Sequence, residues 1–188
     1  KNIPYSVVPG NHDYECPGNN IQSRNTNIYK NYFGLDNYKN NDWFIASDKS
    51  QRNMAQKFII NDKSFLHIGL EWLPSDDAVE FAQKVILEHP NTPVIVTTHS
   101  HLPPKPASYK SIAAISPNSS GKNSPKELFK KLFDPFPQIF LVLSGHYPGN
   151  GELQSFNLFN TPVNQILANY QHDPEGGNGW LNELRFNT

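Results

Sequence analysis

The sequence predicts a single domain of the α/β class, and three observations support this prediction. Short runs of apolar and β-branched residues alternate with amphipathic helical segments, which is the order of a largely parallel sheet covered by helices. Histidines and other polar residues directly follow three of these runs, where α/β sheets form their ligand sites. The length of 188 residues, with 37% hydrophobic content, is sufficient for one domain with a buried core.

Eight short runs are predicted as strands because they are rich in apolar and β-branched residues and are bounded by turn-forming residues. They lie at 3–8, 56–60, 64–70, 93–97, 139–143, 153–159, 163–170 and 181–186. The second and third flank the turn Asn61-Asp62-Lys63 and are expected to form a hairpin. The last three make the end of the chain rich in β-structure.

Two helices are predicted to begin after a capping residue, one at 75–88 with an apolar face and a shorter one at 124–133. Residues 14–53 are dominated by Asn, Tyr, Lys and Ser without a sustained period, and 102–125 are rich in Pro and Ser. Both segments are predicted as long surface loops, the first with one short helix near 28–33. Loops of this length in a compact domain are often functional.

The balance of charges excludes some partners. A formal net charge of −1 and a pI near 6.7 give no electrostatic reason to expect a nucleic-acid or anionic-membrane partner. No segment approaches the ~20 apolar residues of a membrane-spanning helix. Cys16 is the one cysteine, which excludes an internal disulfide. We therefore expect neither a nucleic-acid partner nor a membrane span, and the oligomeric state is left open.

Three polar clusters each follow a predicted strand. Gly10-Asn11-His12-Asp13 follows the first, Thr98-His99-Ser100-His101 follows 93–97, and Gly145-His146 follows 139–143. Since the carboxyl ends of neighbouring parallel strands meet at one edge of a sheet, we expect these histidines to come together. Neutral imidazole and carbonyl oxygen suit Zn, Fe, Mn or related divalent ions.

Within these clusters the residue types indicate particular roles. Gly10 permits a tight turn and a close backbone approach to a ligand. Asn11 offers a carbonyl oxygen as a ligand, and His12 beside it can donate a proton. His99 and His101 are competing candidates, of which one is expected to bind metal and the other to line the pocket.

The Gly10–Asp13 segment resembles the GNH(D/E) motif of the calcineurin-like metallophosphoesterases. His99 and Gly145-His146 match the order and spacing of later motifs of that family, and the segment 168–181 resembles its secreted bacterial members. The resemblance implies a four-layer α/β/β/α sandwich, of which residues 1–188 would be a single partial domain. It also favours a periplasmic or secreted location. The family's first strand–helix units, with its DxH and GDxxD segments, are expected upstream of Lys1.

The resemblance also implies roles for five residues. The ligands of one divalent ion would be Asn11, His99 and His146. His12 would stabilise or protonate the leaving oxygen, and Asp13 would orient His12. Intact members use two ions (Zn, Fe, Mn or similar). One departure concerns the final GHxH motif, because Pro148 stands at its second histidine and the first metal loses a ligand.

The expected function is therefore hydrolysis of a phosphomonoester or phosphodiester by a dinuclear metal site. This chain would be the C-terminal part of the enzyme and poorly active alone. The alternative is a degenerate, non-catalytic binding module with the same fold, which Pro148 favours. Glu71 also follows an apolar strand, but a place in the site is the less favoured interpretation. A nuclease ranks last because the chain lacks a basic groove.

Overall fold

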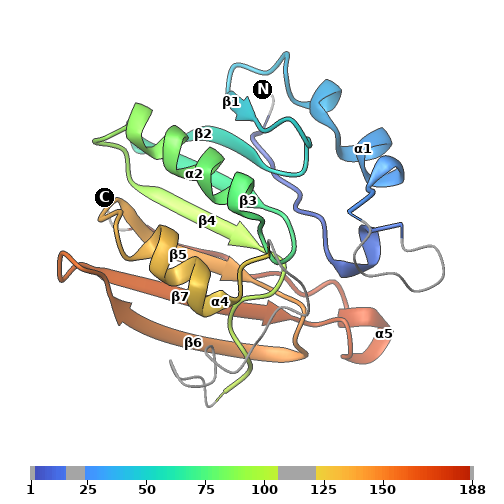
Figure 1. Cartoon of the computed structure of the whole chain (residues 1–188). Helices are drawn as coiled ribbons and strands as arrows, with labels where there is room; N and C mark the ends of the chain where they lie inside the picture. Colours follow the sequence, from blue (N-terminus) through green and yellow to red (C-terminus); the bar gives the residue numbers. More distant parts are fainter. Residues whose placement is uncertain (1–2, 16–23, 106–121, 187–188) are drawn as a thin grey trace.

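A seven-stranded mixed sheet forms the centre of the molecule (Figure 1). The computed structural model describes residues 3–15, 24–105 and 122–186. The strands lie side by side in the order β1-β2-β3-β4-β5-β7-β6. Their bounds are β1 (Phe44–Ser47), β2 (Met54–Ile60), β3 (Lys63–Leu70), β4 (Val94–Thr98), β5 (Ile139–Ser144), β6 (Gly149–Phe156) and β7 (Pro162–Asn169). β3, β4, β5 and β7 run parallel, and β1, β2 and β6 add antiparallel pairs at the two sides. The predicted α/β class is confirmed.

One face of the sheet carries the helical layer, which lies in front in Figure 1. This layer consists of α2 (Asp76–Glu88), α4 (Pro125–Leu128) and the π-type η4 (Phe129–Phe133). α1 (Asn27–Phe33), α5 (Pro174–Gly177) and the shorter turns η1 (Asn11–Asp13) and η3 (Leu35–Asn37) lie outside it. Ser75 caps α2 as predicted, because its Oγ accepts a hydrogen bond from Ala78 N at 3.3 Å. The main core fills the space between α2, α4, η4 and the sheet, and it includes Leu66, Ile86, Val96, Phe133 and Val142.

Two extended segments lie over the opposite face of the sheet. At Gly69 of β3, an added Cβ would meet Val8 Cγ1 at 2.8 Å, so Val8 packs directly on that strand. The Phe186 ring lies 5.4 Å from the Phe65 ring and 6.1 Å from the Phe140 ring. The predicted strands at 3–8 and 181–186 are therefore wrong. Their apolar residues cover the face of the sheet instead of pairing along an edge.

The sandwich is only partly formed by the described residues. They build one sheet and one helical layer, and the extended segments 3–10 and 180–186 stand on the second face. The second sheet and second helical layer of the expected four-layer arrangement are not formed by residues 3–15, 24–105 or 122–186.

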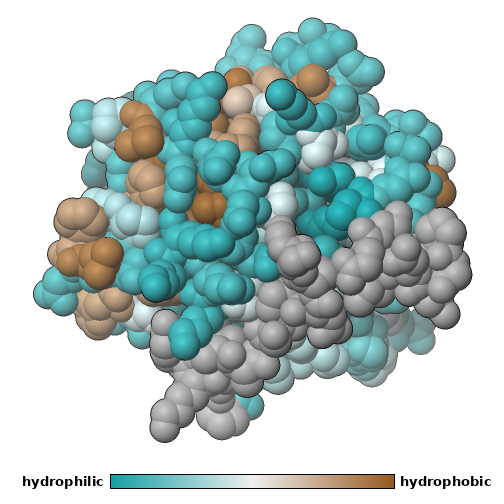
Figure 2. All heavy atoms as spheres, in the orientation of Figure 1, coloured by the Kyte–Doolittle hydropathy of each residue, from teal (hydrophilic) through white to brown (hydrophobic). Residues whose placement is uncertain are grey.

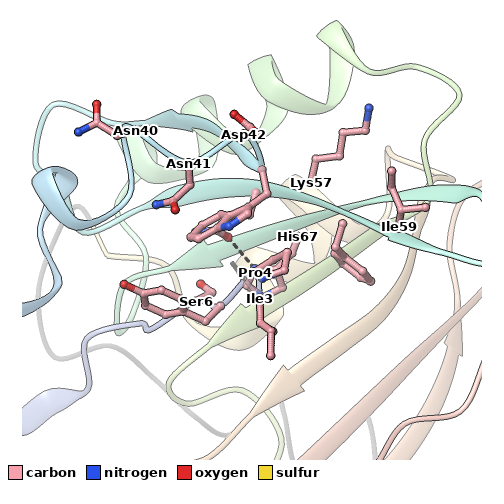
Figure 3. Close-up of a pocket in the computed structure, with 13 residues that line it drawn as sticks. Ile3, Pro4, Ser6, Asn40, Asn41, Asp42, Lys57, Ile59 and His67 are labelled. Carbon is pink, nitrogen blue, oxygen red and sulfur yellow. Dashed lines mark hydrogen bonds between the residues drawn. The ribbon is translucent and has the colours of Figure 1, made fainter. Parts of the chain in front are cut away.

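A hollow of about 1190 Å³ lies between the segment 3–6 and strands β2 and β3 (Figure 3). Aromatic rings of Tyr5, Trp43 and Phe58 line it. His67 also lines it, and its Nδ1–H donates to Gln56 Oε1 at 3.0 Å. The His67 Nε2 accepts from Thr97 Oγ1 at 2.8 Å. Because both ring nitrogens are paired within the sheet, His67 has a structural role.

The long insertion is more structured than expected. The short helix near 28–33 is confirmed as α1, but the edge strand β1 was not predicted. A separate apolar cluster buries Tyr38 and Trp43 against Met54. Much of the second predicted loop, together with 16–23, lies outside the described residues.

The other predicted strands and both longer helices are found, with small shifts of their ends. The hairpin turn between β2 and β3 contains Asn61 and Asp62 at positive φ (47° and 64°), as a two-residue turn of the type I′ class requires. β6 ends at Phe156 because Asn157 Oδ1 accepts hydrogen bonds from Phe159 N and Thr161 N, which closes a turn.

Figure 2 shows a mostly hydrophilic surface on the face with the helices. Apolar atoms gather at the left, where Figure 1 draws the turn between β6 and β7. In that turn Leu158 is 75% exposed and Phe159 is 59% exposed. Among residues 3–15, 24–105 and 122–186, no helix is long and apolar enough to cross a membrane.

The imidazole of His67 is expected to make folding depend on pH. Burial lowers the pKa of His67 to about 4, whereas an unfolded histidine titrates near 6.5. The unfolded chain therefore binds more protons between these values, and the free energy of unfolding falls as the pH falls from 6.5 to 4.

His67→Gln should remove about 2 kcal/mol of this pH dependence. Urea unfolding at pH 7 and pH 4.5 measures it, with the exposed His172→Gln as the control. The prediction fails if the variant keeps the full difference between the two pH values.

Candidate metal centre

Three chain segments converge at the carboxyl ends of β4 and β5. His99 directly follows β4, and Gly145 N donates a hydrogen bond to His99 O at 2.9 Å, which ties the two strand ends together. The turn η1, blue in Figure 1, lies beside the arrowhead of β4. His99 Nε2 is 2.7 Å from Asn11 Oδ1 and 3.0 Å from His146 Nδ1. The structure therefore brings together the three residues that the sequence analysis singled out as ligands.

The turn η1 is held by two reciprocal hydrogen bonds. Asp13 N donates to Gly10 O at 3.1 Å, and Gly10 N donates to Asp13 Oδ2 at 2.7 Å. The Asp13 carboxylate thus closes the turn that presents Asn11. His12 is exposed at the outside of this turn.

Gly10 lets the turn approach the imidazole of His99 closely. A Cβ at position 10 would lie 2.9–3.2 Å from three atoms of that ring. The backbone of Gly10 has an ordinary φ of −88°, which other residues also adopt. Glycine is therefore needed here because the His99 ring leaves no room for a Cβ, and not because of the backbone conformation.

His146 has a strained backbone. Its φ is +69°, in the left-handed region that residues with a Cβ seldom adopt. Such strain costs on the order of 1–3 kcal/mol and is concentrated at functional sites. The strained conformation places His146 Nδ1 next to His99 Nε2.

Both imidazoles of the centre are neutral at pH 7. Burial lowers the pKa of His99 to about 4, with repulsion from His146 in the same direction and a weaker opposing attraction to Asp13. Burial also lowers the pKa of His146, and the charge of His12 adds to this effect. Neutral imidazole is the form that binds metal ions.

Two of the donor separations are compatible with ligands at right angles around one divalent ion. Ligands at about 2.1 Å from one ion and at right angles to each other lie about 3.0 Å apart. The observed separations of 2.7 and 3.0 Å are close to this value. No group of three His, Cys, Asp or Glu side chains in the described ranges is placed to hold an ion, so an ion bound here would need the amide oxygen of Asn11 as a third donor. The side chain of Pro148 carries no donor.

A hollow of about 480 Å³ borders the centre on the open face of the sheet. His99 lines one side of it, and the C-terminal segment with Trp180, Leu181 and Leu184 forms another. Trp180 is 67% exposed and Leu181 76% exposed, so this wall faces both the hollow and solvent.

One polar residue of these clusters lies elsewhere than the sequence suggested. His101 was expected to line the pocket, but it is 0% exposed, contacts Phe133, and donates from Nε2 to Gln165 Oε1 at 2.7 Å. The chain leaves the strand after Thr98, so alternation along β4 no longer sets the direction of His101.

Glu71 was a minor candidate, and the structure buries its carboxylate between Arg24 and Arg52. Sequence reasoning missed these arginines, which come from the long insertion. The one available signal was the position of Glu71 directly after β3, at the same sheet edge as His99.

Comparison with known proteins gives two similarities. A family profile described as calcineurin-like phosphoesterase matches residues 1–150. A Bacillus subtilis (strain 168) protein described as uncharacterized protein YvnB is 27% identical over 198 residues, which covers 98% of this chain. The match covers 13% of that relative, so the chain spans only a small part of its length.

Gly10→Ala is expected to weaken metal binding by displacing the His99 ring. We expect a loss of affinity of about tenfold, or about 1.4 kcal/mol, with little change in stability because the φ of Gly10 suits alanine. Calorimetric titration with Zn²⁺ measures this.

Gly145→Ala is the matched control, because a Cβ there would have its nearest neighbours at 3.7 and 3.8 Å, an ordinary contact. Equal affinities of the two variants would contradict the steric argument.

The strain at His146 can be measured without metal. His146→Gly should be more stable than His146→Ala by about 1 kcal/mol, because glycine adopts positive φ without a steric cost. Urea unfolding compares the two. At His89, where φ is −127°, the same pair should show the opposite order. A more stable alanine variant at position 146 would rule out strain there.

Proposed function

Because the chain belongs to the calcineurin-like phosphoesterase family, we propose that it takes part in metal-dependent hydrolysis of a phosphoester. The observation that carries the proposal is the convergence of Asn11, His99 and His146 within hydrogen-bond distance at one sheet edge. Two neutral imidazoles and one amide oxygen are a donor set for a divalent ion such as Zn, Fe or Mn.

Each residue near the centre has a proposed role. Asn11, His99 and His146 would hold one ion, which supplies Lewis-acid polarisation of the phosphoryl oxygen and a nucleophilic water at neutral pH. His12, exposed next to these donors, would donate a proton to the leaving oxygen. Asp13 would support His12 by its charge while its carboxylate keeps the turn closed on Gly10.

The dinuclear site is a proposal for the whole protein. The residues gathered here would supply ligands for one ion, and Pro148 would provide none for a second. A phosphorylated substrate would enter from the open face, where the hollow beside His99 lies. We propose weak or no turnover by the 188 residues alone, since three neutral ligands bind a divalent ion weakly.

A second candidate is a binding module that retains the fold without turnover. Pro148 is the specific observation in its favour, because it is exposed two residues after His146 and cannot ligate. In that case Asn11, His99 and His146 would bind an ion or a phosphate group without hydrolysis.

The proposal is tested by metal content and by hydrolysis of p-nitrophenyl phosphate and bis-p-nitrophenyl phosphate. Both are measured on this chain and on the full-length product of its gene. His99→Ala should lose bound metal, whereas His12→Ala should keep it and lower kcat by about 10²-fold. His172→Ala, in an exposed turn, is the control.

Retained metal with no turnover of either ester by the full-length protein would favour the binding module. Absence of bound metal in the full-length protein would reject both the hydrolase and the metal site.

A further inference from the structure

Glu71 stands at the centre of a buried ion cluster beside the candidate metal centre. Its side chain is 0% exposed. Oε2 lies 2.6 Å from Arg24 Nη2 and 2.5 Å from Arg52 Nε, and Oε1 accepts from Ser75 N and Oγ at 3.2 and 2.9 Å. Burial raises the pKa of Glu71, but the two guanidinium groups and Ser75 outweigh burial and hold the pKa below its ordinary value. The carboxylate is therefore charged at neutral pH.

The two arginines are fixed by further contacts. Arg52 Nη1 donates to Arg24 O at 2.8 Å, and Arg24 Nη2 donates to Trp72 O at 3.0 Å. The Arg24 guanidinium carbon lies 4.6 Å from the centre of the Tyr14 ring, a cation–π contact. Tyr14 also packs edge-on against Trp72, with the ring centres 5.8 Å apart. The Tyr14 ring is therefore in contact with both Arg24 and Trp72.

The cluster touches two of the three segments that carry donors of the metal centre, those of Asn11 and His99. Tyr14 directly follows η1, is 6% exposed, and donates its hydroxyl to Glu71 Oε2 at 3.3 Å. Thr98 directly precedes His99 and donates its hydroxyl to the backbone oxygen of Glu71 at 3.1 Å. Glu71 thus contacts the neighbours of Asp13 and His99.

We propose that Glu71 is a positioning residue that, with Arg24 and Arg52, fixes Tyr14 and so holds Asn11 within reach of His99. A buried carboxylate paired with two cations tolerates few arrangements, because any displacement leaves a charge unpaired. Because Tyr14 contacts this cluster and directly follows η1, the fixed position of its ring also limits the movement of η1. The effect on a metal centre rests on the proposed function, whereas the position of the turn can be measured without any activity.

The competing explanation is a purely structural tie between the long insertion and the start of α2. That role would stabilise the fold without a specific effect on the turn at 11–13. The two explanations differ in where a variant loosens the chain and in whether it changes the metal centre.

Hydrogen–deuterium exchange of the full chain tests the position of the turn. Glu71→Gln keeps the shape of the side chain and removes its charge. We expect amide exchange in the peptide covering residues 9–15 to be about fivefold faster than in the wild type. Tyr14→Phe removes only the hydroxyl, keeps the arginine pairs, and should produce the same change to a smaller extent. Tyr14→Phe also provides the test of the positioning role if Glu71→Gln does not fold.

Two controls separate positioning from general destabilisation. Asp76→Asn neutralises another carboxylate near the start of α2, which lies 2.7 Å from Lys131 and does not contact Tyr14. Leu132→Ala opens a cavity in the core, where Leu132 is 0% exposed. Neither should accelerate exchange in residues 9–15 beyond its effect on the rest of the chain.

Titration with Co²⁺, followed by its visible absorption, reports on the centre itself. Glu71→Gln should lower the Co²⁺ affinity about tenfold and change the absorption bands, whereas Asp76→Asn should leave both unchanged.

Unchanged exchange in residues 9–15 of both Glu71→Gln and Tyr14→Phe would overturn the positioning role, whatever the metal result. Faster exchange there in the two variants, together with a wild-type protein that binds no Co²⁺, would support positioning and reject the metal site. The two failures are therefore distinguishable.

Discussion

Parallel pairing of β4 with β5 is the constraint on which the candidate metal centre depends. Parallel neighbours end at the same edge of a sheet, so the residues that follow them meet there. The hydrogen bond from Gly145 N to His99 O extends this pairing just beyond the strands. It sets His146 beside His99 despite 46 intervening residues. Asn11 reaches the same point from an extended segment that crosses the open face, so one edge of the sheet collects donors from three distant parts of the chain.

The fold could be predicted from the sequence where local pattern and tertiary environment agree. The hairpin of β2 and β3, the capped helix α2 and the parallel strands all combine apolar periodicity with clear boundary residues. The segments 3–8 and 181–186 have the composition of strands, but composition does not specify whether an apolar segment pairs along an edge or covers a face. β1 was missed because it has four residues with an irregular register inside a polar insertion.

The candidate site also contains residues that could be predicted from the sequence and residues that could not. Asn11, His99 and His146 could be identified because each follows a glycine or an apolar strand in a recognisable motif. The partners of Glu71 could not, since Arg24 and Arg52 lie 47 and 19 residues away in an insertion without periodicity. The direction of His101 depends on where β4 ends, which residue types alone do not determine. The candidate metal ligands could thus be predicted from the sequence more readily than the residues that fix the geometry around them.

The two edges of the sheet present different surfaces to other molecules. β1 is short and irregular, whereas β6 has eight residues that could serve as a template for another strand. The loop after His101 obstructs this edge. Lys105 donates its N–H to Asn150 O at 3.1 Å, and its ammonium group lies 3.5 Å from Glu152. Association of further strands at the longer edge is therefore limited by residues 102–105, which lie against β6, and not by the packing of the core.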